Sequence, residues 1–136
     1  MPESRRPRGL LDTSVIIDLE RLDPDQLPIE IAVSAISMAE LAAAPHATAD
    51  PDERARRQDR LQRTEATFDP LPLDSEAARA YGRVYAAVVS SGRQASGARA
   101  VDLLIAATAC AANLPLYTRN ADDFHALHHL VEVISG

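Results

Sequence analysis

The sequence predicts an α/β fold in which a central parallel sheet of four or five short strands lies between two layers of helices. Short apolar runs that are typical of buried strands alternate along the chain with longer stretches of helical periodicity. No repeat, low-complexity tract or long linker interrupts this alternation. We therefore expect a single domain over residues 1–136, with residues 1–8 as a flexible tail.

The first expected strand is the run Gly-Leu-Leu-Asp at residues 9–12. Thr13 or Ser14 is a suitable N-cap for the helix that follows through Leu19. A second strand is expected over residues 29–35. It leads into a helix over residues 37–44, which Pro45 ends.

The middle of the chain predicts two helices. Residues 51–67 form a polar helix with five arginines between positions 54 and 63, and residues 71–73 form a weak third strand between two prolines. Residues 75–90 have the periodicity of an amphipathic helix. Its expected buried face carries Ala78, Tyr81, Tyr85 and Val88.

The last third of the chain begins with the most apolar segment. Residues 98–113 are rich in alanine and apolar almost all round, so we expect a buried helix. Residues 116–118 form a fourth strand, residues 122–129 a short helix and residues 131–134 a last strand. In a parallel sheet of this kind the ligand site lies at the carboxyl ends of the strands.

The composition excludes several classes of enzyme. The 136 residues carry 14 basic and 20 acidic side chains, and all 14 basic residues are arginine. Without lysine the chain has neither a P-loop nor a Schiff-base nucleophile, and its five scattered glycines do not form a dinucleotide-binding fingerprint. The net charge of −6 argues against a surface coated in positive charge, although it leaves room for a local basic face.

Other sequence features indicate a soluble, cytoplasmic protein. No run approaches the roughly 18 apolar residues of a membrane span, and charged residues stand where the apolar part of a signal peptide belongs. The single cysteine, Cys110, excludes an internal disulfide framework and a cysteine-rich zinc site. We interpret Cys110 as a small buried residue.

Asp12 ends the first strand, so its side chain is expected at the carboxyl edge of the sheet. The alternative role is a helix cap, because aspartate is common at such positions. Thr13 and Ser14 follow directly, and their hydroxyls and backbone amides are candidates for holding a phosphate.

Glu40 has two interpretations. Ser37-x-x-Glu40 matches a capping box, in which the glutamate reaches back to the Ser37 amide. Glu40 also follows the end of the second strand by a few residues and can face the same edge as Asp12.

Asp102 begins the apolar helix, and no charged residue follows it until Arg119. Arg99 is a possible helical partner, three residues upstream. Because ionised carboxylates are rarely buried without a partner, and a surface pair does not explain the apolar surroundings, we favour a metal ion as the partner of Asp102.

A last polar cluster follows the fourth strand. We interpret Asp122 as a charge in the first helical turn and keep Asn120 and Asp123 as site candidates. Several carboxylates at one edge would repel each other unless a divalent cation lay among them. Oxygen ligands favour Mg²⁺, with Mn²⁺ as a substitute.

Three segments, LLDTSVIIDLE, SAISMAELAAA and RAVDLLIAATACAANLPLYTRNADDF, give the chain a resemblance to PIN domains, in particular to VapC-type toxins of toxin–antitoxin systems. The resemblance covers nearly the whole chain after Gly9. It implies a PIN-like three-layer α/β/α fold and a Mg²⁺-dependent endoribonuclease that hydrolyses RNA. It also implies a homodimer that is neutralised by a cognate VapB-type antitoxin.

The acidic positions of the family fall on Asp12, Glu40 and Asp102. The resemblance implies that Asp12 and Asp102 hold the metal, that Glu40 completes the metal shell or orients the attacking water, and that Asn120 or Asp123 supplies a fourth group. We further expect Thr13, Ser14, Thr118 and Arg119 to bind substrate. The alternative from another class is a PIN-like module that binds RNA or a protein without cutting.

Two remaining features have open or structural interpretations. The arginines of residues 51–67 alternate with acids and are expected to form a solvated face with ion pairs; contact with RNA or antitoxin is the alternative. His125, His128 and His129 lie close together without a cysteine or acidic partner at zinc-like spacing, so we expect them to be structural.

Overall fold

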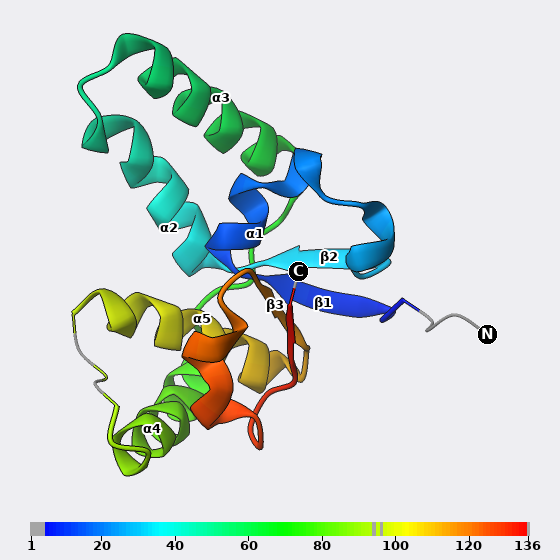
Figure 1. Cartoon of the computed structure of the whole chain (residues 1–136), viewed down its shortest axis with the longest axis vertical. Helices are drawn as coiled ribbons and strands as arrows, with labels where there is room; N and C mark the ends of the chain where they lie inside the picture. The colour runs from blue at the N-terminus through cyan, green and yellow to red at the C-terminus, as the bar shows by residue number, and fades with distance from the viewer. Residues whose placement is uncertain (1–4, 94, 96, 136) are drawn as a thin grey trace.

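The computed structural model describes residues 5–93, 95 and 97–135 and has the expected α/β fold around a parallel sheet (Figure 1). The strands are β1 (Arg8–Leu11), β2 (Glu30–Val33), β3 (Leu116–Thr118) and β4 (Val133–Ser135). The α-helices are α1 (Thr13–Ile17), α2 (Ala35–Ala43), α3 (Pro51–Thr67), α4 (Ser75–Ser90) and α5 (Ala98–Ala112). The 3-10 helices are η1 (Leu19–Arg21), η2 (Pro24–Gln26), η3 (Ala44–Ala47) and η4 (Ala121–Leu127).

The described strands lie in the order β2-β1-β3-β4, and each neighbouring pair is parallel. Leu10 of β1 is in register with Ala32 on one side and with Leu116 on the other. The expected strand over residues 71–73 is wrong. Leu71 makes only an isolated bridge to Ser34, because the prolines on either side of it have no N–H to extend a ladder.

The sheet lies between two hydrophobic cores, one on each of its faces, and helices cover both cores. Successive strand residues point to opposite faces of a sheet, so Leu10 and Leu116 enter one core while their neighbours Leu11 and Tyr117 enter the other. Figure 1 shows α1, α2 and α3 on one side of the sheet and α4, α5 and η4 on the other. The sequence-based prediction of helices on both faces is therefore confirmed.

The buried face of α4 differs from the predicted one. Ala77, Ala80, Val84 and Val88 are buried. Of the predicted face only Val88 is fully buried, while Ala78 and Tyr85 are exposed. Three of the four buried positions lie one residue before the predicted ones, which is about 100° around the helix, and α4 turns its small residues toward the alanine-rich α5, which forms the same core.

Several bounds of helices and strands also differ from the expectation. The N-cap of α1 is Asp12, neither Thr13 nor Ser14, and the helix ends at Ile17. The helix α2 begins two residues early, because the Ser34 hydroxyl accepts the Ser37 N–H at 3.0 Å and caps it there. The segment after β3 is a 3-10 helix over Ala121–Leu127, and the last strand begins at Val133.

The N-terminal residues that the structure describes contact the rest of the protein. The prediction of a flexible tail is therefore wrong for residues 5–8. Arg5 donates to the carbonyl oxygens of Leu27 and Pro28, each at 3.0 Å. Arg6 pairs with Glu132, and Arg8 begins β1. The rest of the predicted tail, residues 1–4, lies outside the described residues.

One glycine is required by packing. Gly9 in β1 lies beneath the Tyr117 ring of β3, and a Cβ at this position would be 2.4 Å from the ring carbon Cε1. A larger residue at this position would therefore displace the Tyr117 ring from the core on that face of the sheet. Within the part of the chain described, no helix has both the length and the apolar character needed to span a membrane.

Candidate active site

The strand ends bring the predicted acidic residues to one edge of the sheet. Asp12 follows β1, and α2, which carries Glu40, follows β2. Residues 119–123 follow β3. Because all described strands are parallel, these segments leave the sheet at the same edge.

Asp12 is buried, with 4% of its surface exposed, and it forms no salt bridge with any residue in the described part of the chain. Asp12 occupies the N-cap position of α1, but its side chain makes no capping hydrogen bond, so a capping role for the carboxylate is wrong. Its Oδ2 accepts hydrogen bonds from the Ser14 hydroxyl at 2.7 Å and the Thr118 hydroxyl at 2.9 Å. A buried carboxylate that is bonded only to neutral hydroxyls keeps its negative charge available for a cation.

The two hydroxyls on Asp12 are themselves fixed by the backbone of the next segment. The Arg119 N–H donates to Ser14 Oγ at 3.1 Å, and the Asn120 N–H donates to Thr118 Oγ1 at 3.1 Å. Each hydroxyl thus accepts from an amide and has its one proton left for Asp12. This network ties the start of α1 to the end of β3.

Glu40 does not take part in a capping box, because Ser34 is the cap of α2. Instead its Oε1 accepts a hydrogen bond from the Thr13 hydroxyl at 2.5 Å, and Thr13 Oγ1 lies 2.8 Å from Ser37 Oγ. The capping-box interpretation is therefore wrong, and Glu40 lies beside α1, where its charge acts on Asp102.

Asp102 lies half-buried in the first turns of α5. Burial, followed by the negative charges of Asp12 and Glu40, raises the pKa of Asp102 from 3.8 to about 6, against the lowering effect of Arg99. Asp123 raises it further. Their effect on the pKa of Asp102 means that these carboxylates lie close enough to repel its charge.

Arg99 is not the ion-pair partner of Asp102. It donates to the Asp123 carbonyl oxygen, and its Nη1 lies 3.7 Å from Asp123 Oδ1. Among the described residues, no salt bridge involves Asp12, Glu40 or Asp102. Three acidic side chains near one edge are thus left without a protein cation.

The candidates after β3 line a separate hollow of about 370 Å³. Its lining comes from residues 119–123 and Ser135 at the end of β4. Asn120 and Asp123 are exposed there, and Arg119 forms a salt bridge of 3.1 Å with Asp18. Asp122 lies in the first turn of η4, as expected. Asp12, Glu40 and Asp102 do not line this hollow, so it forms a neighbouring compartment.

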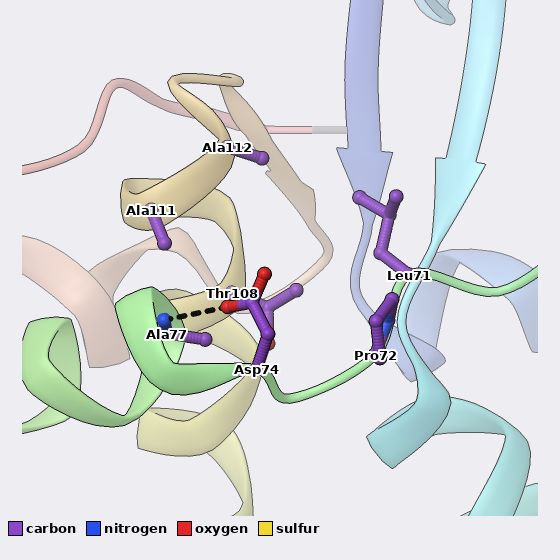
Figure 2. Close-up of a pocket in the computed structure, with 7 residues that line it drawn as sticks. All are labelled: Leu71, Pro72, Asp74, Ala77, Thr108, Ala111 and Ala112. Carbon is purple, nitrogen blue, oxygen red and sulfur yellow. Dashed lines mark hydrogen bonds between the residues drawn. The ribbon is translucent and has the colours of Figure 1, made fainter.

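A second cavity is unrelated to these acids. It measures about 80 Å³ and lies between the Leu71-Pro72 loop and the start of α4 and the end of α5 (Figure 2). Its one carboxylate, Asp74, accepts the Ala77 N–H at 2.9 Å and so caps α4. We assign it a role in packing.

The remaining sequence candidates have ordinary surroundings. His125, His128 and His129 are exposed, with the His125 and His128 rings stacked at 5.5 Å. Cys110 is half-buried, with its sulfur 3.9 Å from an Arg83 nitrogen. In α3, Glu53 pairs with Arg56 and Arg57, and Asp59 pairs with Arg63, as expected for a solvated face.

Sequence reasoning missed two side chains beside the acids. The capping-box pattern predicts a cap at Ser37, but the Ser37 hydroxyl contacts Thr13, and the one available signal is its position three residues before Glu40 on the same helix. The spacing makes Arg99 a possible partner of Asp102, but Arg99 bonds Asp123, which is 24 residues away in the sequence. Neither contact has a local signature.

The fold and the acidic edge together define a class of protein, and the chain belongs to the PIN domain family, whose profile matches residues 9–130. Within that family it is of the VapC type. It is 39% identical to Ribonuclease VapC5 of Mycobacterium tuberculosis over 122 residues, which is 88% of this chain and 87% of that one.

A comparison with solved structures also indicates the VapC type. The crystal structure of VapBC-5, a member of the VapBC family of toxin–antitoxin systems from Mycobacterium tuberculosis, matches with a TM-score of 0.84 and 38% identity, over 96% of this chain and 99% of the other. VapBC2 from Rickettsia felis, bound to a DNA fragment from its promoter, matches with a TM-score of 0.74 and 22% identity, over 94% and 99% of the two chains. The latter similarity concerns the fold alone.

Proposed function

We propose that this chain is a divalent-metal-dependent endoribonuclease and the toxin of a toxin–antitoxin pair. The observation that carries the proposal is the set of Asp12, Glu40 and Asp102 at one edge of the sheet, where none of the three forms a salt bridge with a described residue. The name of the relative, Ribonuclease VapC5, supports RNA as the substrate.

The side chains suit a hard cation but do not form a complete cage for one. In the parts of the chain that the structure describes, no three His, Cys, Asp or Glu side chains are grouped so that they could hold one ion. Mg²⁺ commonly keeps several waters and takes only one or two carboxylates from the protein, with the rest from substrate phosphate. The oxygen donors of Asp12 and Asp102 fit that requirement, and Mn²⁺ would substitute for Mg²⁺.

Asp12 and Asp102 are the direct or water-mediated ligands in this proposal. A bound divalent ion lowers the pKa of water and neutralises charge that develops on the phosphate. Glu40 completes the shell or orients the attacking water, and its hydrogen bond from Thr13 fixes the carboxylate for that task. Asn120 or Asp123 is the fourth group, facing the neighbouring hollow.

The hydroxyl residues have a positioning role in this proposal. Ser14 and Thr118 donate to Asp12 and Thr13 donates to Glu40, so their protons are directed at the acids. Their contact with substrate would be through the neighbouring backbone. Arg119 is the candidate for contact with phosphate, in competition with its present partner Asp18.

The proposed partners are an RNA substrate, a cognate VapB-type antitoxin and a second copy of the chain, and the proposed compartment is the cytoplasm. The similarity to VapBC-5 supports the antitoxin, because VapBC-5 belongs to a family of toxin–antitoxin systems. The described helices leave no membrane-spanning candidate.

The test is cleavage of total RNA by the purified protein, in Mg²⁺ and in EDTA, with Asp12→Asn as the matched variant. We expect discrete fragments with the wild type in Mg²⁺ only, and none with Asp12→Asn. Fragments with 5′-phosphate ends would distinguish hydrolysis by this site from contaminating metal-independent ribonucleases, which leave cyclic phosphates. RNA binding without cleavage in any divalent ion would contradict the proposal and favour a non-catalytic PIN-like module.

A further inference from the structure

We propose that Ser37 is a positioning residue of the candidate site: its hydroxyl orients Thr13, which in turn holds Glu40. This inference rests on the proposed function. Ser37 lies in α2 with none of its surface exposed, and its side chain touches neither substrate nor metal in the proposal. Its effect would pass entirely through the Thr13 hydroxyl.

The direction of the Ser37 hydroxyl is unusual for a helix. Serine and threonine inside helices often donate to the carbonyl four residues earlier, and Thr64, Thr67 and Thr108 do so here. For Ser37 that carbonyl belongs to Val33, which instead accepts the Leu71 N–H at 2.9 Å. The Ser37 hydroxyl lies 2.8 Å from Thr13 Oγ1 instead, on a different helix.

The donor in each of these hydrogen bonds follows from the final acceptor, Glu40. A carboxylate can only accept, so the one proton of Thr13 is donated to Glu40 Oε1. Thr13 Oγ1 must then accept in its contact with Ser37, and Ser37 must donate. The sequence of donors is therefore Ser37 to Thr13 to Glu40.

Ser37 strengthens the hold on Glu40 in two ways. A hydroxyl that accepts a hydrogen bond is a better donor in the next one, so the bond from Thr13 to Glu40 is reinforced. Two partners also restrict the Thr13 hydroxyl to one direction. Glu40 matters to the site because its charge raises the pKa of Asp102, which means that displacing its carboxylate changes the field at the proposed metal ligands.

The obvious alternative is that Ser37 merely stabilises the packing of α2. Ser34 provides a matched control, because it is also a fully buried serine at the start of α2 but bonds the backbone and neither Thr13 nor Glu40. Ser34→Ala weakens the helix cap without interrupting the hydroxyl chain. Each variant removes a single oxygen atom, so neither should prevent folding.

The experiment measures Mn²⁺ affinity from free Mn²⁺ by electron paramagnetic resonance, together with kcat and KM for RNA cleavage. The variants are Ser37→Ala, Thr13→Val, the double variant and Ser34→Ala. We expect Thr13→Val to weaken Mn²⁺ binding about tenfold or more, as is typical of residues that orient metal ligands. Ser37→Ala should weaken it about threefold and lower kcat more than it changes KM.

The double variant tests the route of the effect. If Ser37 acts through Thr13, the double variant will bind Mn²⁺ as Thr13→Val does, because the second change has nothing left to remove. Ser34→Ala should melt at a lower temperature but bind Mn²⁺ like the wild type. Unchanged affinity in Ser37→Ala, an additive double variant, or an equal loss in Ser34→Ala would each overturn the inference.

The same measurement separates this inference from the proposed function. A wild type that binds no Mn²⁺ would overturn the proposed function and the role of Ser37 with it. A wild type that binds Mn²⁺ and cleaves RNA, with Ser37→Ala indistinguishable from it, would overturn the role of Ser37 alone.

Discussion

Replacing Asp102 by asparagine tests whether the negative charge of Asp102 destabilises the folded protein in the absence of metal. The Asp102 carboxylate is half-buried near Asp12 and Glu40, and Arg99, the cation nearest in sequence, bonds Asp123. Asparagine has nearly the same shape and no charge. The variant therefore removes the repulsion while it keeps the packing of α5.

The magnitude follows from the pKa of Asp102, which burial and the neighbouring acids raise from 3.8 to about 6. One pKa unit corresponds to about 1.4 kcal/mol, which would give about 3 kcal/mol for this shift. Because solvent screens a half-exposed group, we expect about 1 kcal/mol. In EDTA at pH 7.5 Asp102→Asn should be more stable by that amount, and its Tm should be higher by about 3–5 °C.

The pH dependence has a definite sign. The folded protein binds the Asp102 proton more tightly than the unfolded chain, so this group lowers stability as the pH rises from about 4 to 6. The advantage of Asp102→Asn should therefore shrink as the pH falls toward 4. Thermal melting in EDTA between pH 4 and 8 measures both effects. A variant that is less stable than the wild type at pH 7.5 would refute the reasoning, because it would mean that Asp102 has a favourable partner in the protein.

Three further predictions concern the support of the site and the core. Ser14→Ala removes one of the two hydroxyls on Asp12 and should weaken Mn²⁺ binding about tenfold by calorimetry; full affinity would mean that Thr118 alone holds Asp12. Arg99→Gln removes a cation that lowers the pKa of Asp102, so the pH midpoint of Mn²⁺ binding should move upward, and a downward shift would contradict this assignment. Leu103→Ala should cost about 2–5 kcal/mol in urea denaturation, because Leu103 is fully buried, whereas a loss below about 1 kcal/mol would mean that the α5 core can collapse around the gap.

Local patterns in the sequence were sufficient for most elements of the fold. The bounds of α3, α4 and β3 are as predicted, since proline, capping aspartates and strong periodicity mark them. The expected strand at residues 71–73 failed, because apolar character between prolines does not provide the N–H groups of a ladder. The buried face of α4 failed because its packing against α5 decides which of two neighbouring faces is covered.

The candidate site was predictable where it depends on strand ends and not where it depends on long-range contacts. The structure brings Asp12, Glu40 and Asp102 near one another, as their positions after strands and at a helix start indicated. The partners of those acids were not predictable. Thr118 reaches Asp12 from 106 residues away, and such a contact exists only once β1 and β3 are paired.

Titration of Mn²⁺ into the EDTA-stripped protein, followed by melting temperature, tests most directly the claim that the acidic edge is a divalent-cation site. A ligand that binds only the folded state adds about 2.7 kcal/mol at a hundredfold excess over its Kd, which is a large shift for a domain of this size. We predict a saturable rise for the wild type that is lost in Asp102→Asn. An equal rise in both proteins, or none in the wild type, would contradict the account.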